Sequence, residues 1–284
     1  MQESELILNP DGSVYHLAVL PHQIAPLIVT VGDPNRVHLV SQFFDRIDFK
    51  ISNREFVIHT GTYQGVPITC MSTGMGTDNI DIVLNELDAL FNIDLQTRKI
   101  KEHHQSITIV RIGTSGSIRN DIPVGSVLAT EIAIGLESLF SWYELASPSQ
   151  AEQLWVDQLK QVELPLVPAV FQSDAKLQSL FSSEFESGIT LTAGGFYAPQ
   201  NRKLRLNPSV DVVDRLKNIQ VNGQFVTNIE METAGIYGLS KMLGHKAISI
   251  NTIMANRLTG EFASNPEDIM LNTIQKTLHL LCKS

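Results

Sequence analysis

The sequence predicts an α/β protein with three layers, in which helices cover both faces of a mixed central sheet. Short runs rich in β-branched residues recur along the chain, and most end in Gly, Ser, Thr or Asp, as buried strands that lead into loops do. Helical patterns lie between these runs, and the alternation favours a mostly parallel sheet. The expected strands are PLIVTVGD (26–33), GVPITCMSTG (65–74), SITIVRIGTSG (106–116), GSVLATEIAIG (125–135), GITLTAGG (188–195) and KAISINTIMA (246–255).

Two further segments refine the sheet and its first long helix. EFVIHTGTYQGVPITC (55–70) is typical of an antiparallel hairpin, so the sheet is expected to be mixed. DNIDIVLNELDALFNI (78–93) predicts an amphipathic helix, with Asp78 as its N-cap. Its apolar face is expected to consist of Ile80, Val83, Leu84, Leu87 and Leu90.

The last helix is expected over NPEDIMLNTIQKTLHLLCK (265–283), with Asn265 as its cap and Pro266 in its first position. The charged, aperiodic segment 94–106 is expected to be a surface loop or an extended helix end. No composition break separates the halves of the chain, so we expect one domain over residues 1–284.

Composition narrows the classes of function. A net charge of −9 and a pI near 5.3 argue against a nucleic-acid partner, although local arginines can still bind small anions. Cys70 and Cys282 form no metal-binding pattern and fit a reducing compartment. The N-terminus does not resemble a secretory signal, and the apolar stretches are too short for a membrane span. A soluble, cytoplasmic protein is expected.

The segment VGDPNRV (31–37) has the outline of an anion site. Gly32 ends a strand and would let a ligand approach the backbone. Asp33 is placed to cap the helix that Pro34 opens, and Arg36 lies in the first turn of that helix. Helix amides and a guanidinium together favour a negative ligand. An ordinary capped turn with a solvent-facing arginine explains the same residues.

The segment VRIGTSGSI (110–118) places Arg111 inside an apolar strand. A charge in a central strand is costly unless it is paired, so Arg111 is expected to point into a site at the strand's C-terminal end. Thr114 and the amides that follow add donors suited to phosphate. The turn lacks the GxGxxG pattern of dinucleotide folds and the lysine of a P-loop.

In AGGFYAPQNRK (193–203), Gln200 and Arg202 are two residues apart and would face the same way in an extended segment. Glutamine donates and accepts hydrogen bonds, and arginine offers a planar fork of donors. The pair suits the edge of a planar amide or imide, and Phe196 could stack on a ring. A polar surface loop is the alternative interpretation.

In NIEMETAG (228–235), Glu230 and Glu232 interrupt an apolar stretch, where unpaired carboxylates are costly. They are expected in a strand or coil that approaches a helix N-terminus, whose dipole favours negative charge. The helix dipole is enough to stabilise one of the two carboxylates, and the other needs a partner of its own. Asn256 and Arg257, at the end of the last strand, are the candidates.

Arg54 and Glu55 in SNREFVIHTG (52–61) are adjacent, which is typical of an exposed ion pair at a strand edge. Such pairs contribute little to stability, and nothing in the local sequence indicates a function for them.

Taken in order, these segments resemble the nucleoside phosphorylase-I family, and within it the uridine phosphorylase branch. Single motifs are weak, but seven in family order cover nearly the whole chain. The resemblance implies one α/β domain with a partly barrel-like sheet, assembled as homodimers or trimers of dimers. The matching motifs are GDPNRV (32–37), NREF (53–56), STGMG (72–76), RIGTSGSI (111–118), FYAPQNR (196–202), EMETAG (230–235) and ANR (255–257).

The resemblance assigns roles to individual residues. Phosphate would be held by Gly32, Arg36, Arg111 and Thr114, with Arg54 reaching into the neighbouring subunit's site. Ribose would be held by Thr114, Met231, Glu232 and, across the subunit interface, His16 in VYHLAVL. The base would contact Phe196, Gln200, Arg202 and Glu230, with Arg257 nearby. The implied catalytic set is Arg111, Gln200, Arg202, Glu232 and Arg257.

The implied reaction is phosphorolysis of a nucleoside to a free base and ribose 1-phosphate. Phosphate stabilises an oxocarbenium-like sugar and attacks it, so the two glutamates need not form a glycosidase-type acid/base pair. Glu232 would clamp the ribose, and Glu230 would pair with Arg257. Phosphate is a co-substrate, and no metal or organic cofactor is expected. Some relatives hold a monovalent cation at the dimer interface.

Departures from the family pattern leave base and sugar preference open. They are Ala198-Pro199 before the glutamine, Thr77 to Asn79 after STGMG, the apparent insertion 94–106 and the unusual segment 136–149. The purine branch has an aspartate where this chain has Asn256-Arg257, which disfavours purine nucleosides. The alternatives are a purine nucleoside phosphorylase, a nucleosidase of the same fold, which would lack a full arginine set, and an inactive binding protein.

Overall fold

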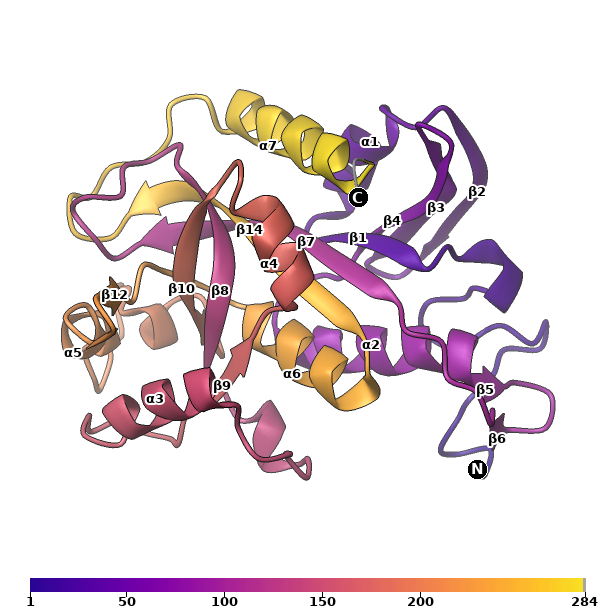
Figure 1. Ribbon diagram of the computed structural model, residues 1–284, viewed down its shortest axis with the longest axis horizontal. Helices are drawn as coiled ribbons and strands as arrows, with labels where there is room; N and C mark the ends of the chain where they lie inside the picture. The colour runs from indigo at the N-terminus through magenta and orange to yellow at the C-terminus, as the bar shows by residue number, and fades with distance from the viewer. Residues whose placement is uncertain (283–284) are drawn as a thin grey trace.

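The computed structural model describes residues 1–282 and confirms an α/β fold around a mixed sheet (Figure 1). The strands are β1 (Leu27–Val31), β2 (Arg46–Asn53), β3 (Phe56–Tyr63), β4 (Val66–Ser72), β5 (Ile93–Asp94), β6 (Lys99–Ile100), β7 (Thr108–Ser117), β8 (Val127–Leu136), β9 (Ala169–Gln172), β10 (Glu186–Ala193), β11 (Gln220–Val221), β12 (Gln224–Phe225), β13 (Asn228–Glu230) and β14 (Lys246–Asn256). The α-helices are α1 (Pro34–Ser41), α2 (Thr77–Asn92), α3 (Gln150–Leu159), α4 (Ala175–Phe181), α5 (Val212–Leu216), α6 (Thr233–Leu243) and α7 (Pro266–Leu281).

The main sheet has ten strands, of which nine run in the order β13-β10-β8-β14-β7-β1-β4-β3-β2, with β9 beside β8. Strands β1, β4, β7 and β14 pair in parallel, whereas β2, β3 and β4 form the expected antiparallel hairpins. Strand β13 pairs with β10 on one side and with β7 on the other. Strands β7, β14, β8, β10 and β13 therefore close into a small barrel, and the rest of the sheet extends from β7.

Helices cover both faces of the sheet (Figure 1). Helices α1, α4 and α7 pack together on one face, and α2 packs beside α6 on the other. The predicted apolar face of α2 is confirmed, because all five of its residues are buried in one core. The prediction that Asp78 caps this helix is wrong. Gly76, with φ of +89°, occupies the cap position and Asp78 lies in the first turn.

Two other predictions at chain segments need correction. Residues 94–106 are neither a simple loop nor a helix end, because β5 and β6 form a small antiparallel hairpin at their start. Asn265 and Pro266 begin α7 as expected, but the Asn265 side chain makes no capping hydrogen bond. Lys283, the last residue of the expected helix, lies outside the described residues. Among the described residues, no helix has both the length and the apolar character of a membrane span.

Candidate active site

Three strands and three helix N-termini meet at one edge of the sheet. Strands β4 and β7 flank β1 in parallel, so Val31 lies beside Ser72, and Thr30 beside Arg111. The carboxyl ends of parallel strands share an edge, and the loops that leave them gather there. Helices α1, α2 and α6 begin in these loops or just after β13. Their first amides favour negative ligands at this edge.

The turn after β1 has the predicted geometry. The Asp33 carboxylate accepts a hydrogen bond from the Asn35 amide at 2.9 Å, and Pro34 is the first residue of α1. A Cβ atom at Gly32 would lie 3.4 Å from the Gly74 carbonyl oxygen, so the loops after β1 and β4 are in contact. Arg36 is half-buried rather than fully solvent-facing. Burial, and then the nearby Arg111, lower its pKa.

Arg111 is buried and holds both glutamates of the NIEMETAG segment. Its Nη2 atom lies 2.5 Å from Oε2 of Glu232 and 3.0 Å from Oε2 of Glu230. The expectation that Glu230 pairs with Arg257 is therefore wrong. Glu230 also accepts hydrogen bonds from the Thr192 hydroxyl and from the amides of Glu232 and Thr233, which lie at the start of α6. With these partners the buried Glu230 carboxylate is fully hydrogen-bonded, so it needs no ligand to compensate its charge.

Glu232 joins two helix N-termini. It occupies the cap position of α6, and its Oε1 atom accepts a 2.8 Å hydrogen bond from the Gly76 amide, at the cap position of α2. Burial and the adjacent Glu230 raise the pKa of Glu232, although Arg111 acts in the opposite direction. For Arg111, burial acts to lower its pKa, but the two glutamates outweigh it and the net pKa is raised.

Gly113 makes room for the arginine. A Cβ atom at this position would collide with the guanidinium of Arg111, so that group lies over the Gly113 backbone and extends toward the C-terminal end of β7. The prediction that Arg111 points to this end of the strand agrees with that placement. Thr114 follows, half-buried and in register with Thr252 of β14.

The charges of this cluster balance before any ligand is present. Arg36 and Arg111 contribute two positive charges, and Glu230 and Glu232 contribute two negative charges when ionised. An incoming anion must therefore displace a carboxylate from Arg111, bring a proton, or meet a further cation, because uncompensated charge in a buried site is costly.

Gln200 and Arg202 meet as predicted, but through a different backbone. Residues Ala198–Gln200 form a 3₁₀ turn and Asn201 has φ of +58°, so the segment is not extended. The Arg202 Nη1 atom donates to Gln200 Oε1 at 2.6 Å and to the Phe196 carbonyl at 2.7 Å. Its guanidinium carbon lies 3.6 Å from the centroid of the Phe196 ring. Phe196, half-exposed, thus stacks on the arginine.

Arg257 lies beside this loop. Burial and the nearby Arg257 lower the pKa of Arg202 to about 10, and burial also lowers the pKa of Arg257. The Arg257 side chain packs over Gly116, near the end of β7. Strand β7 therefore links the Arg111 cluster to the Gln200–Arg202 pair. Neighbouring Asn256 does not pair with either glutamate, because its side chain bonds the backbone of Arg119, Ile122, Leu258 and Thr259.

His16 and Arg54 lie near each other, and among the described residues no hydrogen bond or ion pair joins either of them to Arg111, Glu230 or Glu232. Arg54 is exposed in the turn between β2 and β3 with φ of +53°. The expectation that it pairs with Glu55 is wrong, because no ion pair joins the two in the part of the chain that the structure describes. Its guanidinium carbon lies 5.4 Å from the centroid of the Tyr15 ring, which packs edge-on against His16. His16 Nδ1 lies 2.5 Å from Glu86 of α2, and Asn53 donates to the His16 carbonyl. The two residues that the family resemblance assigns to a neighbouring site share one surface here.

Sequence reasoning missed three residues that position the site. Gly76 binds Glu232, Gly113 accommodates Arg111, and Asn251 accepts a 2.9 Å hydrogen bond from Arg111 Nη1. The signal for Asn251 was present, since a polar side chain interrupts the apolar run ISINTIMA. Met231, whose backbone the family resemblance assigns to ribose, is half-buried between the two glutamates.

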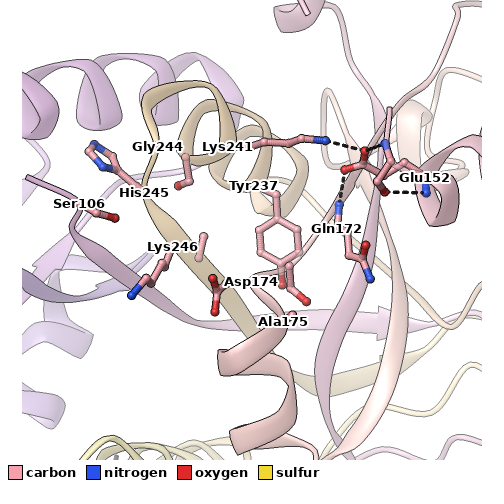
Figure 2. Close-up of a pocket in the computed structure, with 14 residues that line it drawn as sticks. Ser106, Glu152, Gln172, Asp174, Ala175, Tyr237, Lys241, Gly244, His245 and Lys246 are labelled. Atoms are coloured by element: carbon pink, nitrogen blue, oxygen red, sulfur yellow. Dashed lines mark hydrogen bonds and ion pairs between the residues drawn. The ribbon is translucent and has the colours of Figure 1, made fainter. Parts of the chain in front are cut away.

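A cavity of about 500 Å³ lies at the opposite edge of the sheet, near the N-terminal ends of β7 and β14 (Figure 2). Its lining includes Lys246, the first residue of β14, and the buried Glu152. The Glu152 carboxylate accepts hydrogen bonds from Lys241 Nζ at 2.6 Å and from the Gln172 backbone amide at 2.9 Å, and Figure 2 shows how these groups face one another. These bonds join α3, α6 and β9. None of the predicted site residues lines this cavity.

Known proteins resemble the chain along most of its length. Residues 26–282 match the family described as the phosphorylase superfamily. A uridine phosphorylase of Thermococcus kodakarensis is 31% identical over 263 residues, which cover 90% of this chain and 82% of that protein. A DeoD-type purine nucleoside phosphorylase of Mannheimia succiniciproducens is 26% identical over 253 residues, which cover 89% of this chain and 90% of that protein.

Solved structures of nucleoside phosphorylases are also similar to this chain over nearly its whole length. A Trypanosoma brucei nucleoside phosphorylase described as showing uridine phosphorylase activity is 29% identical, with a TM-score of 0.89 over 98% of this chain and 100% of that one. A uridine phosphorylase of Phytophthora capsici is 22% identical, with a TM-score of 0.71 over 100% and 99% of the two chains, and shares the fold.

Proposed function

The chain belongs to the phosphorylase superfamily, and from this membership we propose that it is a uridine phosphorylase. It converts uridine and inorganic phosphate to uracil and ribose 1-phosphate, which makes it a pentosyltransferase. The uridine phosphorylase of T. kodakarensis and the T. brucei nucleoside phosphorylase are the relatives that support this activity.

One observation carries the assignment of the site. Strand β7 holds the Arg111 cluster beside Gly113 and the Arg257 side chain over Gly116, and Arg257 neighbours Arg202. The two glycines are three residues apart, which corresponds to about 10 Å along a strand. The arginine cluster and the Arg202–Arg257 pair thus both lie near the C-terminal end of β7, where phosphate and a planar base can be held within one nucleoside's length of each other.

Each group then has a role in the reaction. Arg36, Arg111, Thr114 and the amides after Gly32 hold phosphate, whose charge stabilises the cationic sugar before the attack. Glu232 and the Met231 backbone bind the ribose hydroxyls. Gln200 and Arg202 stabilise the negative charge that develops on the departing uracil. The attacking group is phosphate itself, so no protein base is required.

The position that distinguishes purine enzymes supports the pyrimidine assignment. Family resemblance places an aspartate there in purine phosphorylases, whereas this chain has Asn256, whose amide is fully engaged with loop backbone. A neutral side chain in that role donates no proton to a purine nitrogen.

The balanced charges of the Arg111 cluster support a site shared between subunits. Phosphate adds negative charge that the four ionised side chains do not offset, and a further arginine would reduce this deficit. Arg54 and His16 lie together on an exposed surface of this chain, as groups supplied to a partner would. We therefore propose a homodimer, or a trimer of dimers, with Arg54 and His16 completing the neighbour's site.

The cellular role that follows is the salvage or breakdown of pyrimidine nucleosides. We place it in the cytoplasm, which the free thiols of Cys70 and Cys282 support. Phosphate is a co-substrate, and the proposal includes no metal or organic cofactor.

A substrate panel tests the function. Purified protein is incubated with uridine, deoxyuridine, thymidine, inosine or adenosine, each with and without phosphate, and the released base is measured. Uridine is expected to react fastest and only with phosphate. Faster release of hypoxanthine or adenine would instead assign the chain to the purine phosphorylases that it also resembles.

A further inference from the structure

The interior of the barrel formed by β7, β14, β8, β10 and β13 carries a belt of polar side chains. Small barrels are usually filled by branched apolar side chains. Here each strand contributes a buried polar residue, and hydrogen bonds link these residues in sequence. We call this set the polar belt: Asn251 of β14, Thr130 of β8, Thr190 of β10, Asn228 of β13 and Ser115 of β7.

The contacts run from strand to strand without a gap. Asn251 Nδ2 donates to Thr130 Oγ1 at 2.9 Å, and the Thr130 and Thr190 hydroxyls lie 2.7 Å apart. Thr190 donates to Asn228 Oδ1 at 3.0 Å, and Asn228 Nδ2 donates to Ser115 Oγ at 3.0 Å. Because Arg111 bonds Asn251 and lies on the same strand as Ser115, the chain of bonds that starts at Arg111 returns to β7.

Arg111 at one end and the Asn228 oxygen at the other fix the directions of the bonds between them. A guanidinium can only donate, so the Asn251 oxygen must face Arg111 Nη1, at 2.9 Å, and its NH₂ group must face Thr130. Asn228 Oδ1 can only accept, so Thr190 donates its single proton to Asn228 and must accept from Thr130. Asn251 also donates to Ser249 Oγ at 3.1 Å, and that hydroxyl lies 3.3 Å from Arg111 Nη1. A fully satisfied buried network of this kind holds one arrangement.

We propose that Asn251 is a positioning residue that holds the Arg111 guanidinium ready for phosphate, with the polar belt as its support. The two glutamates engage Nη2, whereas Asn251 and Ser249 engage Nη1. Phosphate can replace a glutamate at Nη2 without freeing the guanidinium, because Nη1 stays anchored to the barrel. This inference rests on the proposed phosphorolysis and adds a residue that touches neither phosphate nor nucleoside.

The test compares Asn251→Leu with wild type, because leucine is similar in size but accepts no hydrogen bond. The KM for phosphate is expected to rise about tenfold or more, since a hydrogen bond to a charged group is lost. The KM for uridine stays within about twofold. Phosphate binding without nucleoside, measured by calorimetry, weakens by the same factor. A structural role alone would lower the melting temperature and leave the phosphate KM unchanged, which overturns the proposal.

A matched pair of milder variants keeps the test decisive if Asn251→Leu does not fold. Thr130→Val breaks the belt, whereas Thr252→Val removes an equally buried hydroxyl that instead bonds Thr273 of α7. Only Thr130→Val is expected to raise the phosphate KM, by about threefold. Equal phosphate KM values in the pair overturn the belt's role. Wild-type turnover of uridine without phosphate overturns the proposed function, and this inference with it.

Discussion

Glu232 and Arg111 form the closest charged contact of the candidate site, with 2.5 Å between Oε2 and Nη2, although 121 residues separate them in sequence. The contact joins the start of α6 to the middle of β7. It means that the predicted ribose ligand and the predicted phosphate ligand bind each other before any substrate arrives. Phosphate that binds at Arg111 must therefore compete with this ion pair, or be accompanied by the proton or the further cation that the balanced charges require.

Removal of Arg111 is expected to destabilise the protein strongly. Arg111→Met leaves Glu230 and Glu232 buried together without the cation that contacts both, which costs about 3–5 kcal/mol in the free energy of unfolding at pH 8. The loss should shrink as the pH falls, because burial and Glu230 raise the pKa of Glu232 and its protonation relieves the repulsion. Urea unfolding at pH 8 and pH 5 measures both effects. An equal loss at the two pH values would contradict this account.

Gly113→Ala tests whether the position of the Arg111 guanidinium depends on the absence of a side chain at residue 113. The added methyl group occupies the space of the Arg111 guanidinium and displaces it. Misplacement by about 1 Å can reduce a rate roughly 100-fold, and that loss is expected in kcat/KM for phosphate. Steady-state kinetics with phosphate varied at saturating uridine give the value. Wild-type kinetics in this variant would show that Arg111 is not held over Gly113.

Arg202→Ala should abolish most uridine phosphorolysis and leave the fold intact. The half-buried guanidinium is one of two donors suited to the departing base, and the loss of such a donor costs about 3–4 kcal/mol of barrier. Arg205→Ala is the matched control, because Arg205 lies in the same loop and is exposed. Circular dichroism checks the fold of both variants. Similar activity in the two would remove Arg202 from the base site.

Mixed subunits test whether Arg54 acts across an interface. Arg54→Ala and Arg202→Ala are each expected to inactivate the enzyme. A mixed dimer of the two variants contains one complete site, provided by Arg202 of one subunit and Arg54 of the other. Activity should therefore return on mixing after brief unfolding and refolding. If no activity returns, although mixed dimers form, each subunit contains its own Arg54 site.

The lowered pKa of His59 is expected to reduce the free energy of unfolding at acidic pH. Its ring is buried and contacts the Ser41 hydroxyl at 2.7 Å, and burial together with His38 lowers its pKa to about 4. The unfolded chain binds a proton near pH 6.5, whereas the folded protein does so only near pH 4. The contribution of neutral His59 is therefore complete above pH 6.5 and is lost as the pH falls toward 4. The gap in unfolding free energy between wild type and His59→Gln should narrow over this window.

Much of the fold could be predicted because local patterns decide it. The apolar runs that end in small residues form strands of the main sheet, of which β1, β4, β7 and β14 pair in parallel, and Pro34 opens α1 after Asp33 as expected. Barrel closure could not be predicted from the residues alone, because it depends on a three-residue strand, β13, that pairs on both sides. Only the family resemblance indicated it.

The sequence predicts which candidate residues lie near one another better than it predicts their contacts. The two-residue spacing predicts that Gln200 and Arg202 lie close together in an extended segment. In the structure they are brought together by a 3₁₀ turn and by Asn201 in the left-handed conformation, which the sequence pattern does not reveal. Glu230 was assigned to Arg257 because both are polar and near strand ends. The register of β13 against β10 instead brings Glu230 beside Thr192, and it pairs with Arg111.

The identity of the sugar product tests the central claim most directly. Phosphate-free enzyme is given uridine, first alone and then with inorganic phosphate, and the products are separated and quantified. The account predicts no turnover without phosphate, and equal amounts of uracil and ribose 1-phosphate with it. Release of uracil and free ribose in the absence of phosphate would contradict it, because water and not arginine-bound phosphate would then be the nucleophile.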